Sequence, residues 1–407
     1  MRLTSSPKVV QCLLGWTKDY LSCPQFLHIR IFVIGVLVTG ESQLKALAEA
    51  TSFGKHRTSL ALFLSRAQWD EQAILAEQMR RVLKSMNPRK GEYLYLLIDD
   101  TRIVKRSTTM DDANKLWDHS HQRFARGHMV VTVAVRFRGV TLPWRLQVWQ
   151  PKAVAGRKYV KTTEIAAAMI REFEPPRGVK VRVLFDAFYL CVKVTNACKS
   201  CGFTWFSVAS KNRKLTREQG RSGSLKSLAP GILKYSGHRV RLKRDRGWRW
   251  MRITSANGRL AKIGDVRIVF SKRPRDPWTK VLAVATNELT RSDRDVIEIY
   301  EKRWNIEVLF KELRSELGLG DYRMQTRKGI RRHLHLVCLA HLVLTHHSLK
   351  SAGAKTRQPN SDIPLPKFQE RITSLRDEIR RDQITTFTKK IRHEKTRKQV
   401  RQFLLAT

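Results

Sequence analysis

Acidic side chains are scarce in this 407-residue sequence. It has 35 Asp and Glu residues against 79 Lys and Arg residues, a formal net charge of +44. A charge of this size determines what a protein binds more than how it folds, and it indicates a polyanionic partner, with nucleic acid as the first candidate. Because 42% of the residues are hydrophobic, the chain is able to bury one large core or two to three smaller ones. This argues against a small basic protein of the ribosomal kind.

Cysteines and long apolar runs are also few. Of six cysteines, only Cys198 and Cys201 have CxxC spacing, and no second pair follows at the distance of a zinc site. We therefore expect free thiols in a reducing compartment rather than a disulfide-rich secreted scaffold. The longest apolar run, residues 31–38, is far shorter than the ~20 residues that span a bilayer, and no signal-peptide cleavage pattern follows it. The sequence thus predicts a cytoplasmic protein without membrane contact.

The first 90 residues are predicted to form a helical region. Residues 42–70 suggest two short helices on either side of Phe53 and Gly54, the second beginning after the basic residues 55–57. This is the size and polarity of a helix-turn-helix, whose second helix enters a major groove. Two short helices with a glycine turn are equally common in any bundle, so both interpretations stay open. Residues 87–91 have the composition of a linker.

Beyond this linker the pattern changes to alternating strands and helices. Strands are expected at residues 93–101, 127–139, 140–150, 179–187 and 203–210, with helices at 161–173 and 190–199 between the later ones. Three strands, helix, strand, helix, strand is the order of an RNase H-like domain. Its parallel strands bring their ends together at one sheet edge, where functional sites form.

Two of these apolar strands end in carboxylates, which are costly at such places unless they are exposed or coordinated. The first strand ends in Asp99 and Asp100, and the fourth ends in Asp186. Mg²⁺ prefers carboxylate oxygens and keeps several waters, so three acids suffice for a pair of ions. Phosphodiester hydrolysis and strand transfer use two such ions ~4 Å apart. The pattern therefore calls for a third acid elsewhere in the chain.

A helix expected over residues 300–320 supplies a candidate. At ~100° per residue, one stripe roughly 80° wide, separate from the apolar core face, contains Tyr300, Arg303, Glu307, Lys311 and Arg314. An ordinary amphipathic helix needs only a core face and a solvent face. A salt-bridged surface helix is the alternative explanation of this third face.

The spacing of Tyr300, Arg303 and Glu307 resembles the Tyr-x2-Arg-x3-Glu-x6-Lys signature of the IS4-type DDE transposases. Arg314 stands where that family has Lys, and the two cations are not equivalent. The resemblance covers residues 92–345 or so, and residues 117–120 with 127–128 are similar to the branch around IS701. It implies that Asp186, Glu307 and one acid of the first strand hold two Mg²⁺ ions, with Mn²⁺ as a substitute.

The identity of the first acid is ambiguous, because neighbouring residues on a strand point to opposite faces. The order Ile98-Asp99-Asp100-Thr101 fits the RNase H-like pattern of an apolar residue, Asp, any residue and then Ser or Thr, which selects Asp99. An alignment that sets the acid directly before Thr101 selects Asp100.

A long segment separates Asp186 from Glu307, and residues 211–287 have the short alternating stretches of a β-rich insertion. The resemblance implies such an insertion. Its first cations, Lys211 and Arg213, are expected to contact DNA, as are Tyr300, Arg303, Trp304, Lys311 and Arg314. A basic strip with tryptophans, residues 241–252, is a further candidate, although core packing is the more common role of a single tryptophan.

We therefore expect an α/β protein with three parts. These are a helical DNA-binding region (1–90), an RNase H-like catalytic domain with its insertion (91–350) and a basic helical tail (351–407). The resemblance implies a bacterial, nucleoid-associated transposase that cuts double-stranded DNA at terminal inverted repeats and joins it to target DNA, as a homodimer in the synaptic complex. Two alternatives are an inactive transposase-derived repressor and a structure-specific nuclease without strand transfer.

Overall fold

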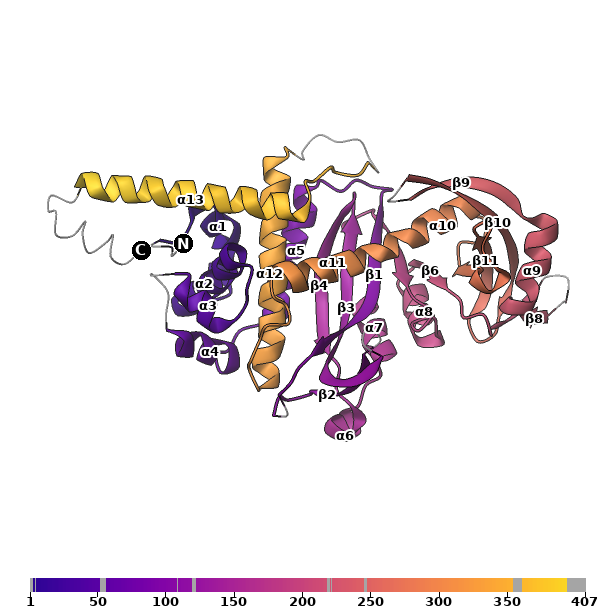
Figure 1. The fold of residues 1–407 in the computed structure, drawn as a ribbon, viewed down its shortest axis with the longest axis horizontal. Helices are drawn as coiled ribbons and strands as arrows, with labels where there is room; N and C mark the ends of the chain where they lie inside the picture. The colour runs from indigo at the N-terminus through magenta and orange to yellow at the C-terminus, as the bar shows by residue number, and fades with distance from the viewer. Residues whose placement is uncertain are drawn as a thin grey trace.

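A computed structural model describes residues 3, 5–51, 56–107, 109–118, 122–217, 220, 222–244, 247–353 and 361–393. The fold is mixed α/β and elongated (Figure 1). Helices of the N-terminal region gather at one end, a large sheet occupies the middle and the other end, and a long C-terminal helix runs back over the N-terminal helices.

The N-terminal helices are α1 (Lys8–Leu14), α2 (Cys23–Thr39), α3 (Leu44–Glu49), α4 (Arg57–Ser65) and α5 (Glu71–Ser85). Local signals set their ends. A capping box of Ser22 and Gln25 begins α2, and Gly40 ends it with a left-handed φ of 76°. The Asp70 side chain accepts the first free N–H groups of α5. The turn expected at Phe53 and Gly54 lies outside the described residues.

In the part of the chain that the structure describes, one mixed sheet of twelve strands forms the body of the molecule. Its strands are β1 (Tyr93–Val104), β2 (Asn114–Asp118), β3 (Arg123–Phe137), β4 (Val140–Val148), β5 (Lys180–Phe185), β6 (Thr204–Val208), β7 (Lys214–Arg217), β8 (Ser222–Ser224), β9 (His238–Arg244), β10 (Gly247–Leu260), β11 (Gly264–Lys272) and β12 (Leu282–Thr286). The order is β2-β3-β1-β5-β6-β12-β11-β10-β7-β8, with β4 on β3 and β9 on β10. β1, β5 and β6 are parallel to one another, whereas β3 is antiparallel to β1.

The segment 211–287 continues this sheet rather than forming a separate one. β12 pairs antiparallel with β6, where Val284 lies opposite Val208, and β11, β10 and β7 follow outward. The segment also contains a helix, α9 (Leu225–Ser236), which the strand-like alternation around it did not predict. Short helices α6 (Lys152–Ala155), α7 (Thr162–Arg171) and α8 (Val192–Ser200) complete the connections between β4, β5 and β6.

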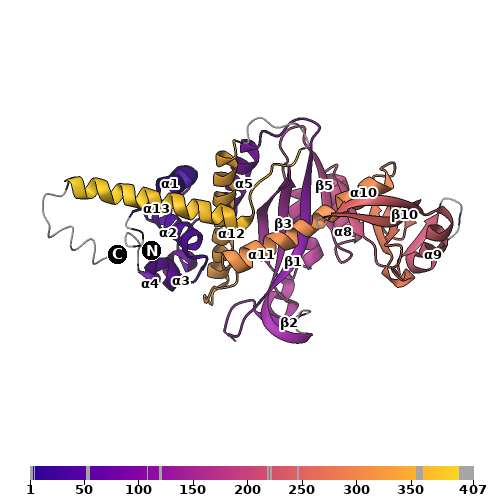
Figure 2. The same ribbon diagram turned by 45° about the horizontal axis from the view of Figure 1, so that its top comes forward.

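The expected helix at residues 300–320 is longer and less regular than predicted. It begins with α10 (Asp293–Glu301), because the Ser292 hydroxyl accepts the Asp295 N–H and acidic residues occupy the first turn. A 3₁₀ turn (Lys302–Trp304), α11 (Asn305–Lys311) and a π-helical turn (Glu312–Glu316) follow. α11 lies across β1 and β4, and the π-helical turn that follows it contacts α12 (Figure 2).

Two long helices complete the fold, α12 (Arg327–Ser351) and α13 (Phe368–His393). α12 is buried along most of its length and contacts α2, α4, α5 and β4, so it joins the N-terminal helices to the sheet. Its Arg332 is 1% exposed and donates to Glu71 at the start of α5. Within the described residues, no helix is long and apolar enough to cross a membrane.

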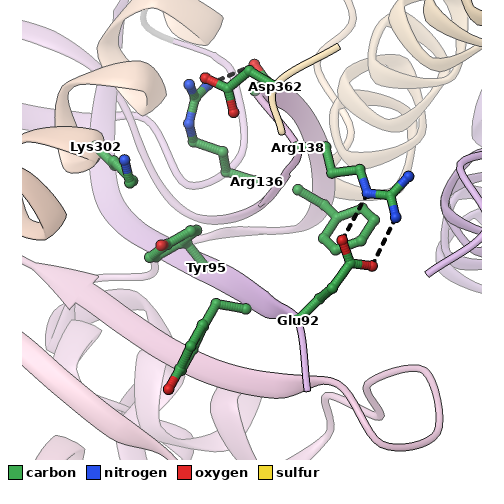
Figure 3. A pocket seen from close by; sticks show the side chains of 9 residues that line it. Glu92, Tyr95, Arg136, Arg138, Lys302 and Asp362 are labelled. Atoms are coloured by element: carbon green, nitrogen blue, oxygen red, sulfur yellow. Dashed lines mark hydrogen bonds and ion pairs between the residues drawn. The ribbon is translucent and has the colours of Figure 1, made fainter. Parts of the chain in front are cut away.

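A second buried ion pair connects α5 to the sheet at the beginning of β1. Arg138, in the turn between β3 and β4, donates from Nε and Nη2 to the two oxygens of Glu92, both at 2.9 Å. Its Nη1 donates to the carbonyl of Met86 at the end of α5. The side chains are 3% and 2% exposed. They line one side of a small polar cavity of about 90 Å³ that also contains Tyr95 and Lys302 (Figure 3).

Candidate active site

The register of β1 and β5 brings two of the predicted acids together. These strands are parallel, and their last paired residues are Leu97 and Leu184. Asp99 lies two residues after Leu97, and Asp186 lies two residues after Leu184. Because side chains alternate between faces, both acids lie on the same face of the sheet at adjoining strands, and Asp100 belongs to the other face.

Arg303 connects the sheet acid to the helix acid. Its Nη1 donates to Asp99 Oδ2 at 2.9 Å, and its Nη2 donates to Glu307 Oε1 at 2.6 Å. The 3₁₀ turn carries Arg303, and Glu307 follows in the first turn of α11. The irregular helix therefore points both side chains at the sheet, and Asp99, Arg303 and Glu307 form one continuous ionic cluster.

The electrostatics single out Asp99 among the acids. Burial raises the pKa of its carboxyl from 3.8 to about 6, and the nearby charges of Asp186 and Asp100 act in the same direction. The Arg303 guanidinium opposes this rise in pKa but does not cancel it. Asp99 thus carries negative charge in a partly desolvated position beside two other carboxylates.

Tyr189 is a site residue that sequence reasoning did not find. It follows Asp186 in a tight turn, where Asp186 Oδ1 accepts the backbone N–H groups of Phe188 at 3.0 Å and Tyr189 at 3.3 Å. The Tyr189 side chain is buried, and its hydroxyl has no hydrogen-bond partner in the part of the chain that the structure describes. Burial raises its pKa, and Asp100, Asp99 and Asp186 raise it further.

Asp is a common turn residue, so Asp186 was the available signal of a turn at this strand end. The sequence could not show that the Tyr189 hydroxyl would be left among carboxylates, because that depends on how β1 and β5 pair.

The remaining residues of the predicted stripe lie around this cluster with different exposures. Tyr300 is half-buried, and burial raises its pKa. Trp304 and Lys311 are exposed. Arg314 is exposed and donates to the carbonyl of Arg102 at 3.1 Å. The helical run therefore presents an aromatic and two cations to solvent next to the acids.

Lys211 and Arg213, which the sequence predicts to contact DNA, each bond to a carbonyl oxygen of the protein itself. Lys211 Nζ donates to the carbonyl of Thr279, and Arg213 Nη2 donates to the carbonyl of Leu190. Both cations bond to the protein's own backbone where the segment 211–287 leaves β6. These bonds hold the start of the segment, and the predicted contact of both side chains with DNA stays a prediction.

A comparison with known families shows which family the chain belongs to. A family model of the transposase DDE domain matches residues 90–343. The chain belongs to the DDE transposase family. The matched residues contain Asp99, Asp186 and Glu307, so the family match and the ionic cluster coincide in the sequence.

The transposase also has a curated relative of the expected type. It is 29% identical over 130 residues to a protein of Microchaete diplosiphon described as a probable transposase for insertion sequence element IS701. The match covers 31% of this chain and 33% of the relative, so the chain spans about a third of that relative's length. The predicted resemblance to transposases of the IS4 and IS701 type is confirmed.

DDE transposase domains generally depend on a divalent metal ion, and the donor chemistry of this transposase fits one. Three carboxylates and an unpartnered Tyr189 hydroxyl are ligands and hydrogen-bond donors suited to a hard, hydrated cation such as Mg²⁺. Among the described residues, however, no three His, Cys, Asp or Glu side chains lie close enough to form a complete ion site. In this arrangement Arg303 supplies the positive charge between Asp99 and Glu307.

Proposed function

We propose that this transposase cuts DNA strands at transposon ends and joins the resulting 3′-hydroxyl to target DNA. The observation that carries the proposal is the matched position of Asp99 and Asp186 on parallel strands, facing the Arg303–Glu307 pair. Two acids lie on adjoining strands and Arg303 links one of them to Glu307, in a protein with a net charge of +44. That combination suits metal-assisted chemistry on a polyanion.

The strand order supports an RNase H-like catalytic core. β4, β3, β1, β5 and β6 lie side by side in this order, with β1, β5 and β6 parallel and β3 antiparallel. Along the chain, β1, β3 and β4 come before α7, with the short β2 between β1 and β3, and helices α7 and α8 precede β5 and β6. On this basis we assign residues 91–350 to the catalytic domain and 211–287 to its insertion, with 1–90 and 351–407 as flanking regions.

Asp99, Asp186 and Glu307 would hold two Mg²⁺ ions, which Mn²⁺ would replace. When bound, such ions activate the attacking oxygen and stabilise the leaving oxygen of the phosphodiester. The protein's own contribution is positioning: β1 and β5 hold two acids rigidly, and α11 supplies the third. Arg303 keeps two of these acids in place and presents a guanidinium fork that suits a phosphate. The Tyr189 hydroxyl offers a hydrogen bond to an acceptor at the site.

DNA would approach along the exposed side of the α10–α11 run. Trp304, Lys311 and Arg314 are exposed there, beside the acids. Arg57 and Thr58 are exposed on α4, which supports the interpretation of α3 and α4 as a helix-turn-helix for the terminal inverted repeats. We expect two copies to act together on the two transposon ends, as a homodimer.

A cleavage assay on DNA that carries the element's own flanking ends tests this function. Wild-type protein in Mg²⁺ should nick these ends. Asp186→Ala and Glu307→Ala should abolish nicking and keep DNA binding, since they remove metal ligands and not phosphate contacts. The matched control is Glu298→Ala, a carboxylate of the same helical run that pairs with Arg294 on the surface, and it should cut normally.

Three results would contradict the proposal. Near wild-type cutting by Glu307→Ala would remove the third acid from the chemistry. Binding without any cutting, in either Mg²⁺ or Mn²⁺, would indicate a repressor. Cutting without joining to a target duplex would indicate a nuclease.

A further inference from the structure

The hairpin of β9 and β10 has one buried face and one face of exposed aromatic and cationic side chains. Leu242, Met251 and Ile253 alternate toward the interior and are buried. Trp248 and Trp250 alternate to the opposite face and are 50% and 56% exposed. Core packing, the more common role of a single tryptophan, is therefore wrong for these two. The inner face packs the hairpin against the rest of the protein, and the two exposed indoles are free to bind a partner.

Cations surround the two indoles on the outer face. Arg241 lies opposite Trp250 in the strand register, and its guanidinium is 5.4 Å from the centre of the Trp248 ring. Arg239, two positions before Arg241 on the same face, is also exposed. Of the residues 225–264, eleven are Lys or Arg and only Asp245 is acidic. The surface is thus complementary to a polyanion and unsuited to another basic face.

Helix α9 extends this surface with a third aromatic side chain. Tyr235, at its end, is 83% exposed, and the Lys234 ammonium is 5.6 Å from the Tyr235 ring. Arg252 on the outer face of β10 donates to the carbonyl of Lys234 at 2.8 Å, which holds the end of α9 against the hairpin. We call Tyr235, Arg239, Arg241, Trp248 and Trp250 the aromatic platform.

An unpaired DNA strand is the partner that fits such a platform. In a duplex the faces of the bases are hidden in the stack, so a duplex offers mainly phosphates to exposed indoles. An unpaired strand offers both phosphates for the arginines and base faces for the aromatic rings. Trp248 and Trp250 are two residues apart on a β-strand, a distance of ~7 Å. This is about twice the ~3.4 Å between neighbouring nucleotides of a stacked DNA strand. A strand drawn out of its stacking would therefore present a base to each tryptophan.

The platform lies on an element that leads to the ionic cluster. β9 and β10 both contact α10, which runs directly into the 3₁₀ turn that carries Arg303. Figure 1 shows the hairpin extending from α9 back along α10 toward the central sheet. We propose that the aromatic platform binds an unpaired DNA strand beside the cleavage site, which rests on the function proposed above. It would hold the strand that is separated from its complement when a transposon end is processed.

Binding of full-length protein to an oligothymidylate strand and to a duplex of unrelated sequence tests this proposal. The double variant Trp248→Ala/Trp250→Ala should bind the single strand about 100-fold more weakly, at about tenfold for each lost stacking contact, and should bind the duplex as wild type does. Trp248→Phe/Trp250→Phe should keep most single-strand affinity, since phenylalanine also stacks. Phe124→Ala, which removes an exposed aromatic side chain of β3, is the matched control and should bind normally.

A second measurement separates stacking from a structural role. The single strand should quench part of the wild-type tryptophan fluorescence, and this quenching should disappear in the double alanine variant while its thermal unfolding is unchanged. Equal losses on single strand and duplex, or no loss on either, would overturn the platform. A change from dimer to monomer in the alanine variant would also overturn it, because the surface would then contact a second copy.

The same data distinguish this proposal from the function on which it rests. If wild-type protein bound neither form of DNA, the proposed function itself would fail. If it bound both forms and the tryptophan variants bound as well as wild type, only the platform would fail.

Discussion

Replacing Asp99 with Asn should stabilise the folded protein at neutral and alkaline pH in the absence of metal ions. The pKa of Asp99 is raised from 3.8 to about 6 in the fold, mainly by burial. An acid whose pKa rises on folding destabilises the folded state at every pH at which the acid is charged. This cost is absent well below pH 4, grows between pH 4 and 6, and is complete above pH 6. Asn has nearly the same shape and carries no charge.

The magnitude follows from the two pKa values. The difference between 3.8 and about 6 corresponds to about 3 kcal/mol at 1.36 kcal/mol per pKa unit. This is an upper bound for the gain at pH 8, because Asn keeps a hydrogen bond from Arg303 but loses the ion pair. By the same linkage relation, about half of the gain remains at pH 5.

Urea unfolding of wild type and Asp99→Asn at pH 5 and pH 8, in a chelating buffer, measures this effect. Asp265→Asn is the matched control, because Asp265 is exposed, and it should change stability little at either pH. Added Mg²⁺ should then stabilise wild-type protein more than Asp99→Asn, since the ion relieves a repulsion that the variant lacks.

The reasoning would be refuted if Asp99→Asn were less stable than wild type, and more so at pH 8 than at pH 5. In that case the ion pair with Arg303 would outweigh the burial of the carboxylate, and Asp99 would be a structural residue.

Three further predictions concern other parts of the molecule. In the cleavage assay, Asp99→Asn should abolish nicking and Asp100→Asn should keep a substantial fraction, and the opposite ranking would place the metals on the other face of β1. Arg314→Ala should lower the salt dependence of DNA binding by about one unit of slope. Its melting temperature should change little, because the exposed side chain loses a hydrogen bond to the Arg102 carbonyl that contributes only about 1 kcal/mol. An unchanged slope with a large drop in melting temperature would make Arg314 a structural residue. Glu92→Gln should destabilise the protein by about 3–5 kcal/mol, as expected for a broken buried ion pair. Urea unfolding should show that the double variant Glu92→Gln/Arg138→Met recovers part of this loss. Equal stability of Glu92→Gln and wild type would rule out a stabilising role for the ion pair.

Much of this transposase was predictable from local patterns. The apolar runs before Asp99 and Asp186 predicted buried strands with acids at or near their ends, because a continuous apolar segment bounded by polar residues depends only on neighbours in the chain. The spacing of Tyr300, Arg303 and Glu307 predicted one shared helical face and the family itself. The excess of cations predicted a polyanionic partner irrespective of the fold.

The exposure and bonding partners of individual side chains were harder to predict from the sequence. Core packing is the more common role of a single tryptophan, but Trp248 and Trp250 are exposed. The bonds from Lys211 and Arg213 to backbone carbonyls were not predicted. A helix that was predicted as regular contains a 3₁₀ turn and a π-helical turn. Each of these outcomes depends on what packs against the residue, and the packing partner is distant in the sequence.

The sequence by itself determined which residue types were available and in which local conformation: acids at or near strand ends, one acid on a helix, and a chain dominated by cations. Tertiary structure alone decided which of them meet. The register of β1 against β5 puts Asp99 and Asp186 on one face, and the packing of α11 across β1 brings Arg303 and Glu307 to them. The physical reason is that helix and strand periodicity arises from contacts within a few residues. Strand register and burial instead arise from contacts between segments far apart in the chain, such as Asp99 and Arg303, which are 204 residues apart.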